Sequence, residues 1–126
     1  MKLDVVCMKV GTGYKHEFVN QLFHQVKHQV NTFTCWTDNP RGFDQNIQVY
    51  EYKSFCVDRL WWNKVNLFEP GLFTNDTIYL DLDCYVHGQL KEFVDNGQIL
   101  KTTWFSNDIN KYIFNCDVNS SILYLK

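Results

Sequence analysis

The chain has 126 residues, a formal net charge of −2 and 17% aromatic residues, which is enough apolar material for one folded domain with a sizeable core. The near-neutral charge argues against a surface that neutralises many phosphates of DNA or RNA, but it permits one small phosphate ligand. No apolar run approaches the roughly 18 residues of a membrane-spanning helix. We therefore expect no nucleic-acid partner and no membrane span. The N-terminal apolar stretch is interrupted by Asp4 and Lys9, which is unlike a signal peptide.

The cysteines indicate a reducing environment. There are five of them, an odd number, and no two stand in a CxxC pair. This spacing argues against a disulfide scaffold and against a structural zinc site. We therefore expect a cytoplasmic protein with free cysteines.

The first third of the chain predicts a strand, a helix and a second strand. Residues 3–10 form an apolar run that predicts a buried strand, and Gly11 and Gly13 follow it in a turn. Residues 15–30 carry apolar side chains with helical spacing. Residues 32–36 are β-branched and aromatic, which predicts a strand parallel to the first, joined to it by a right-handed crossover.

The rest of the chain continues the alternation of strands and helices. Residues 77–86 are the strongest predicted strand of the sequence. The other predicted elements are a short strand at 47–52, a helix at 58–68, helical turns at 89–94, and strands at 99–105 and 121–125. No repeat or linker interrupts the series. The expected fold class is therefore α/β, a single Rossmann-like nucleotide-binding domain over residues 1–126 with a mostly parallel sheet.

Asp81 and Asp83 stand in the predicted strand 77–86. Side chains alternate along a strand, so both carboxylates are expected on one face, roughly 6–7 Å apart. Two such groups on an apolar strand repel each other and lose hydration, which a hard divalent cation would offset. Hydrogen bonds from main-chain donors or pairing with a lysine or arginine would offset it as well. The pattern therefore indicates a magnesium or manganese site, with a structural role as the alternative.

The ends of the first two predicted strands carry a second signal. In open α/β sheets, ligands bind beyond the C-terminal ends of the strands. Gly11 and Gly13 allow close approach of a ligand, Tyr14 can stack on a base, and Asp38 can accept hydrogen bonds from a base or a ribose. An ordinary turn explains the glycines equally well, and packing is the simpler role for Tyr14.

Other suggestive residues have plain structural explanations. The glycine pair could begin a dinucleotide-binding fingerprint, but His16 stands where its third glycine belongs. His24 and His28 have the spacing of metal ligands on a helix, yet they fall opposite its apolar stripe, on an expected solvated face. The tryptophans at 61–62 are more typical of a core or an interface than of a ligand platform. Lys64, one turn further, is by itself a solvated lysine.

Five segments that follow one another along the chain carry a family resemblance. They are residues 6–11 with Tyr14, 62–68, 79–86, 88–93 and 118–123. In this order they resemble nucleotide-sugar glycosyltransferases with the GT-A fold, and they are most similar to the retaining enzymes of glycosyltransferase family 8, the glycogenin-like group. The resemblance runs through most of the chain and implies a minimal GT-A fold, although no single motif in it is specific.

The resemblance implies a UDP-sugar donor and a manganese or magnesium ion. Tyr14 would stack on uracil, Asp38 would contact the base or the ribose, and the Leu82 main chain would lie near the ribose. Lys64 would contact the diphosphate and Asn119 the sugar. The implied donor-binding set is Lys9, Val10, Gly11, Tyr14, Thr37, Asp38, Lys64, Leu82 and Asn119, and the implied metal ligands are Asp81 and Asp83.

The sequence also departs from the family pattern. Ser121 stands where the family usually has glycine, and the chain ends at Lys126, before the family's third metal ligand and most of its acceptor site. His87 is the remaining candidate for a third ligand near the two aspartates. No catalytic residue is assigned, although Asp108 and Asp117 would be the available carboxylates for an inverting reaction.

These observations lead to one expectation and two alternatives. The expectation is a metal-dependent, retaining glycosyltransferase that moves a hexose from a UDP-sugar to an unknown acceptor. It would complete its site by forming a homo-oligomer or with an acceptor-bearing partner. The first alternative is a module that binds UDP or a UDP-sugar without transfer. The second is a generic mononucleotide- or dinucleotide-binding domain, which the broken glycine pattern disfavours.

Overall fold

A mixed sheet forms the centre of the molecule. The computed structural model describes residues 3–53, 60–91, 94 and 122–125. Within these residues the elements are, in chain order, β1 (Leu3–Lys9), α1 (His16–Val26), β2 (Thr32–Thr37), β3 (Gln48–Glu51), the 3₁₀ helix η1 (Leu60–Phe68), β4 (Asp76–Leu80) and β5 (Ile122–Leu125). The architecture is α/β, as the alternation of apolar runs predicts.

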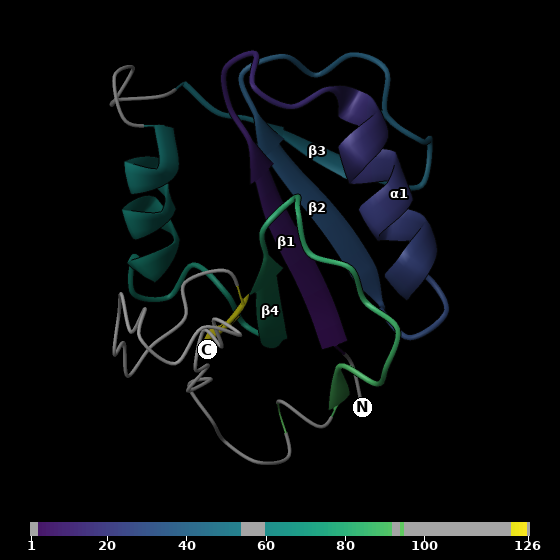
Figure 1. The fold of residues 1–126 in the computed structure, drawn as a ribbon. Coiled ribbons are helices and arrows are strands. Elements are labelled where there is room, and N and C mark those ends of the chain that lie inside the picture. The colour runs from purple at the N-terminus through teal and green to yellow at the C-terminus, as the bar shows by residue number, and fades with distance from the viewer. Residues whose placement is uncertain (1–2, 54–59, 92–93, 95–121, 126) are drawn as a thin grey trace, which may run out of the picture.

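The strand order in the described part of the sheet is β3-β2-β1-β4-β5 (Figure 1). The first four of these strands are parallel to one another, and β5 runs antiparallel to β4 with Ile122 opposite Leu80. The chain adds strands to one side of β1 with β2 and β3, and to the other side with β4. The order therefore reverses at β1, which is compatible with a Rossmann-like fold and places a crevice at the C-terminal ends of β1 and β4.

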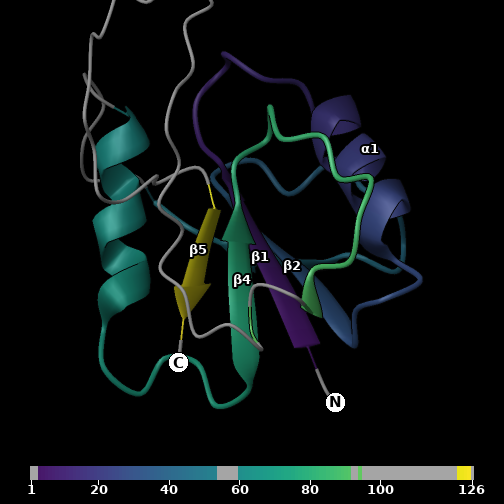
Figure 2. The ribbon, with the colours of Figure 1, turned by 60° about the horizontal axis from the view of Figure 1, so that its bottom comes forward.

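The two helices cover opposite faces of the sheet. Figure 2 shows α1 on one side and η1, drawn in teal, on the other. The alternation of side chains in β1 explains this, because Val5 and Cys7 belong to the core beneath α1, whereas Val6 and Met8 belong to the core on the opposite face. Both sides of the central strand are thus buried, as is typical of parallel sheets.

The strand predicted over residues 77–86 is too long. β4 ends at Leu80, and the chain then turns, with the Cys84 amide donating to the Asp81 carbonyl oxygen at 3.1 Å. The apolar residues beyond Leu80 do not extend the sheet, and further along the loop the Val86 amide is bonded to Gln25 of α1. The expectation that Asp81 and Asp83 share one face of a strand is therefore wrong: both lie in the loop that follows it.

Smaller differences concern the limits of other elements. The first helix is shorter than predicted, since it ends at Val26 and not at residue 30. The helix predicted at 58–68 is the 3₁₀ helix η1 from Leu60 onward, and residues 58–59 lie outside the described part. Of the helical turns predicted at 89–94, residues 92–93 lie outside it, as does the whole strand predicted at 99–105. No helix in the described part of the chain is long and apolar enough to cross a membrane.

The two phenylalanines of α1 allow a matched test of the core. Phe23 is buried against the ring of Phe33 at 5.4 Å, whereas Phe18 is 42% exposed. We expect Phe23→Ala to lower the free energy of unfolding by about 3–4 kcal/mol, because it removes buried contacts and leaves a cavity. Phe18→Ala should lower it by less than about 1 kcal/mol. Urea titration followed by circular dichroism measures both values, and equal losses would contradict this assignment of the buried face.

Candidate functional site

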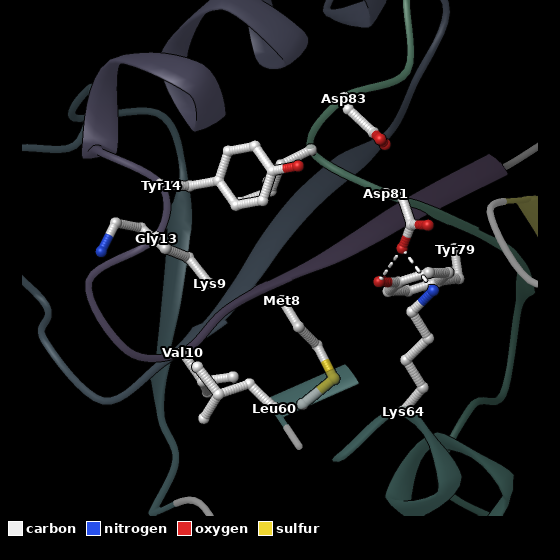
Figure 3. Close-up of a pocket in the computed structure, with 11 residues that line it drawn as sticks. Met8, Lys9, Val10, Gly13, Tyr14, Leu60, Lys64, Tyr79, Asp81 and Asp83 are labelled. Atoms are coloured by element: carbon white, nitrogen blue, oxygen red, sulfur yellow. Dashed lines mark hydrogen bonds and ion pairs between the residues drawn. The ribbon is translucent and has the colours of Figure 1, made fainter. Parts of the chain in front are cut away.

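A cavity of about 270 Å³ lies where the strand order reverses, at the C-terminal ends of β1 and β4. This is the crevice in which open α/β sheets bind their ligands. Figure 3 shows side chains from the end of β1, from η1 and from the end of β4 gathered around it. The lining residues are Met8, Lys9, Val10, Gly13, Tyr14, Leu60, Lys64, Tyr79, Asp81, Leu82 and Asp83.

Asp81 is the centre of the polar wall of this cavity. One of its oxygens, Oδ1, accepts a hydrogen bond from the Tyr79 hydroxyl at 2.6 Å and lies 2.6 Å from Lys64 Nζ (Figure 3). The side chains of Lys64 and Asp81 are only 17% and 20% exposed. A charge at this depth is poorly hydrated, so each member of the pair needs the other.

The buried Tyr79 side chain supports the ion pair between Lys64 and Asp81. Burial raises the pKa of the Tyr79 phenol well above its ordinary value, and the Asp81 carboxylate raises it further. The hydroxyl therefore stays protonated and donates to Asp81 at physiological pH. Lys64 Nζ also lies 5.2 Å from the centre of the Tyr79 ring, close enough for a cation–π contact.

Asp83 lines the same cavity two residues further along the loop and is exposed. In Figure 3 it lies on the side of Tyr14, while Asp81 faces Lys64. The two carboxylates belong to one cavity, as the sequence predicts, although they reach it from a turn. Cys84, the next residue after Asp83, carries no thiolate at neutral pH, because burial and the nearby Asp81 raise the pKa of its thiol to about 11.

Asp81 and Asp83 could hold a divalent cation whose remaining ligands come from water and a substrate. Within residues 3–53, 60–91, 94 and 122–125, no three His, Cys, Asp or Glu side chains are grouped to hold a metal ion. Magnesium commonly takes one or two carboxylates and completes its shell with water and substrate phosphates. The Lys64 ammonium already lies against the Asp81 carboxylate, so a positive charge is favourable at this position. His87, the suggested third ligand, is exposed and lies outside the cavity lining.

The turn after β1 is shaped by Gly11 and Asp38. Gly11 has φ +76°, in the left-handed region that favours glycine, and a Cβ atom there would press against the end of the Leu60 side chain. Its amide donates to Asp38 Oδ2 at 3.0 Å. Asp38 thus fixes the loop that borders the cavity, a structural role for its carboxylate.

Tyr14 forms the other end of the cavity. Its ring is 41% exposed and meets the ring of Phe18 edge-on, with 5.2 Å between centroids. One face of the ring therefore remains available for stacking on a planar ligand. Figure 3 shows it across the cavity from Lys64, so that an aromatic and a charged region face each other.

The structure brings together most of the residues that the sequence predicts for this site. The predicted residues in the cavity wall are Lys9, Val10, Tyr14, Lys64, Asp81, Leu82 and Asp83. Gly11, Thr37 and Asp38 lie outside the lining; Thr37 is fully buried, and its hydroxyl bonds to the main chain of Asn39. Asn119 lies outside the described residues.

Of the other residues weighed from the sequence, His24, His28 and Trp62 lie outside the cavity lining, and Asp108, Asp117 and Ser121 lie outside the described residues. His24 and His28 are exposed, as predicted, and His24 Nε2 lies 3.8 Å from Asp44 Oδ2. Trp62 is also exposed, on the outer side of η1.

Two hydrogen-bond networks that anchor the site are not predicted from the sequence. The first holds the loop after β4. Gln25 of α1 and Gln29, three residues beyond the end of α1, hold the loop that follows Asp81: Gln25 Oε1 accepts from the Val86 amide at 2.7 Å, and Gln29 Oε1 accepts from the Leu90 amide at 2.8 Å. Gln29 lies beyond the last residue of α1, and nothing in the sequence connects these two glutamines to a loop 61 residues away.

The second network fixes η1. The buried Tyr52 hydroxyl donates to Asn63 Oδ1 at 3.2 Å and accepts from Asn66 Nδ2 at 2.5 Å. Asn63 Nδ2 in turn donates to the Leu60 carbonyl oxygen at 2.8 Å. The helix that carries Lys64 is therefore bonded to the end of β3, which sets where Lys64 enters the cavity.

Comparison with protein-family models, with curated proteins and with solved structures found no significant match for this chain.

Gln29 provides a test of the loop anchor. Its Nε2 donates to the Gly88 carbonyl oxygen at 3.0 Å, in addition to the bond that it accepts from Leu90. Gln29→Leu removes both bonds and leaves the amide of the buried Leu90 without its acceptor, which costs about 1–3 kcal/mol locally. We expect the Leu90 amide to exchange with deuterium at least about tenfold faster, measured by NMR. Gln21→Leu, at an exposed position of α1, is the matched control; equal rates in both variants would contradict the anchor.

Proposed function

We propose that this chain binds a UDP-sugar together with manganese or magnesium and acts as a retaining glycosyltransferase of minimal GT-A type that transfers a hexose. The carrying observation is the cavity at the strand reversal, which has Tyr14 at one end, Lys64 and Asp81 at the other, and Asp83 on the side of Tyr14. A nucleoside diphosphate has the matching polarity, with a planar base at one end and anionic phosphates at the other. Nucleotides also bind at this place in open α/β sheets.

The charges around the cavity support the metal requirement. Lys9, Lys64, Asp81 and Asp83 line it, and the Lys64 ammonium is already paired with Asp81. A diphosphate would add uncompensated negative charge beside two carboxylates in a partly buried site. A divalent cation held by Asp81 and Asp83 would compensate that charge and supply electrophilic stabilisation of the leaving diphosphate.

The chain's own residues would then act on the leaving group and the donor. Lys64 would stabilise the negative charge that grows on the diphosphate as the glycosidic bond breaks. Tyr14 would hold the uracil, and the turn fixed by Gly11 and Asp38 would keep Tyr14 in place. As the bond to the diphosphate breaks, the anomeric carbon gains oxocarbenium character; an acceptor hydroxyl would attack it and give its proton to the departing diphosphate oxygen. Asp81 and Asp83 are committed to the cation, so neither is assigned as a base.

A module that binds UDP or a UDP-sugar without transfer is the second candidate. The observation in its favour is the composition of the described cavity wall, in which every assigned residue serves the nucleotide or the cation. No carboxylate other than Asp81 and Asp83 lines that cavity within the described part of the chain. Binding and transfer therefore need separate experiments.

Removal of either carboxylate tests binding. We expect the unmodified protein to bind UDP in the presence of manganese, and Asp81→Asn or Asp83→Asn to weaken that binding at least about tenfold, because each variant loses a charged ligand. Isothermal titration calorimetry with and without manganese measures both effects. Glu69→Gln removes one negative charge from an exposed position outside the cavity and should bind as the unmodified protein does. Equal, metal-independent affinity in both aspartate variants would rule out the metal site.

Release of UDP tests transfer. The protein, incubated with manganese and a panel of UDP-sugars, should release free UDP above the background rate with at least one donor. Asp81→Asn should lower that rate by at least about 100-fold, since the leaving group loses its electrostatic stabilisation. A coupled assay for UDP provides the measurement. Tight binding of every donor without release would favour the binding module.

A further inference from the structure

Lys64 is paired with Asp81, the inner of the two carboxylates proposed to hold a metal ion. Its ammonium lies 2.6 Å from Asp81 Oδ1, and the same oxygen accepts the Tyr79 hydroxyl. Figure 3 shows the lysine side chain rising from η1 directly toward this oxygen. The residue that would bind phosphate in the proposed function is thus the present partner of a proposed metal ligand.

The pair cannot persist unchanged beside a divalent cation. Two positive centres at one carboxylate repel each other, and the repulsion is stronger in a partly buried site than in water. If Lys64 left Asp81 without a new partner, its ammonium would lose its counterion where less than a fifth of its side chain is exposed. A diphosphate in the same cavity would provide that partner.

The side chain of Lys64 is able to make this move while its backbone stays fixed. η1 is bonded to Tyr52 through Asn63 and Asn66, so the helix is anchored at its inner side. The lysine side chain has a flexible four-carbon stem, so the ammonium can rotate from Asp81 into the cavity that both residues line.

We propose that Lys64 is an exchangeable counterion, which neutralises Asp81 in the metal-free protein and passes to the diphosphate of the nucleotide when a divalent cation binds Asp81. The cation and the diphosphate therefore bind cooperatively, each removing the obstacle that the ion pair presents to the other. This inference rests on the proposed function, because it requires that both ligands use this cavity.

The exchange predicts an unusual effect of Lys64→Met. The variant keeps the length of the side chain and removes its charge, so that Asp81 no longer has a competing cation. We expect manganese alone to bind about five- to tenfold more tightly than to the unmodified protein, while UDP binds more weakly. The factor by which manganese and UDP strengthen each other should fall by a similar amount. Part of it remains, because the cation and the diphosphate attract each other directly.

Electron paramagnetic resonance of free manganese, with and without UDP, measures the first affinity, and calorimetry measures that for UDP. By linkage, both titrations of one protein must give the same coupling factor. Lys64→Arg retains the positive charge and should bind manganese alone no more tightly than the unmodified protein does. Lys27→Met removes the same charge from an exposed site at the end of α1 and serves as the matched control.

The outcomes separate the two proposals. Absence of both manganese and UDP binding in the unmodified protein would overturn the proposed function and the exchange with it. If both ligands bind, but manganese alone binds Lys64→Met no more tightly than the unmodified protein, the exchange is wrong and the proposed function stands. Circular dichroism checks the fold of each variant, and Lys64→Gln replaces Lys64→Met if the latter does not fold.

Discussion

The parallel pairing of β1 with both of its neighbours is the constraint on which the site depends. Cys7 and Met8 pair with Cys35 and Trp36 on one side, and Val5 pairs with Ile78 on the other. Since all three strands run the same way, their C-terminal ends meet at one edge. The chain leaves that edge in different directions, toward α1 after β1 and past α1 after β4. The resulting crevice is open because no crossover fills it.

Within that crevice, polar side chains are held at positions where an isolated charge would be unfavourable. Tyr79 is almost completely buried, yet its hydroxyl donates a hydrogen bond to Asp81, and Asp81 forms an ion pair with Lys64. Such a network is stable only if every member keeps a partner. The surrounding hydrogen bonds keep these partners in position. Tyr52 fixes the helix that carries Lys64, and Gln25 and Gln29 fix the loop that follows Asp81.

Local patterns predict the first half of this fold well and the loop after β4 poorly. Apolar periodicity places β1, α1 and β2 within a few residues, because their buried faces follow the periods of a strand and a helix. The same criterion extends β4 through Asp81 and Asp83, since Leu82 is apolar and buried. Whether a segment stays in a sheet depends on its main-chain partners, however, and here those partners are two glutamines that lie far away in the sequence. The bond between Asp38 and the Gly11 amide is not predicted from the sequence for the same reason, because the two residues are 27 positions apart.

The turn after β4 changes what the two aspartates can do. On one face of a flat strand, both carboxylates would have stood at equal depth. In the turn, Asp81 is largely buried against Tyr79 and Lys64, whereas Asp83 is exposed at the rim near Tyr14. A cation that binds both must therefore come from solvent to the Asp83 side and compete with an ammonium on the Asp81 side. That asymmetry favours a ligand whose binding is completed by a phosphate, because an additional anion offers the lysine a new counterion when a cation takes its place at the inner carboxylate.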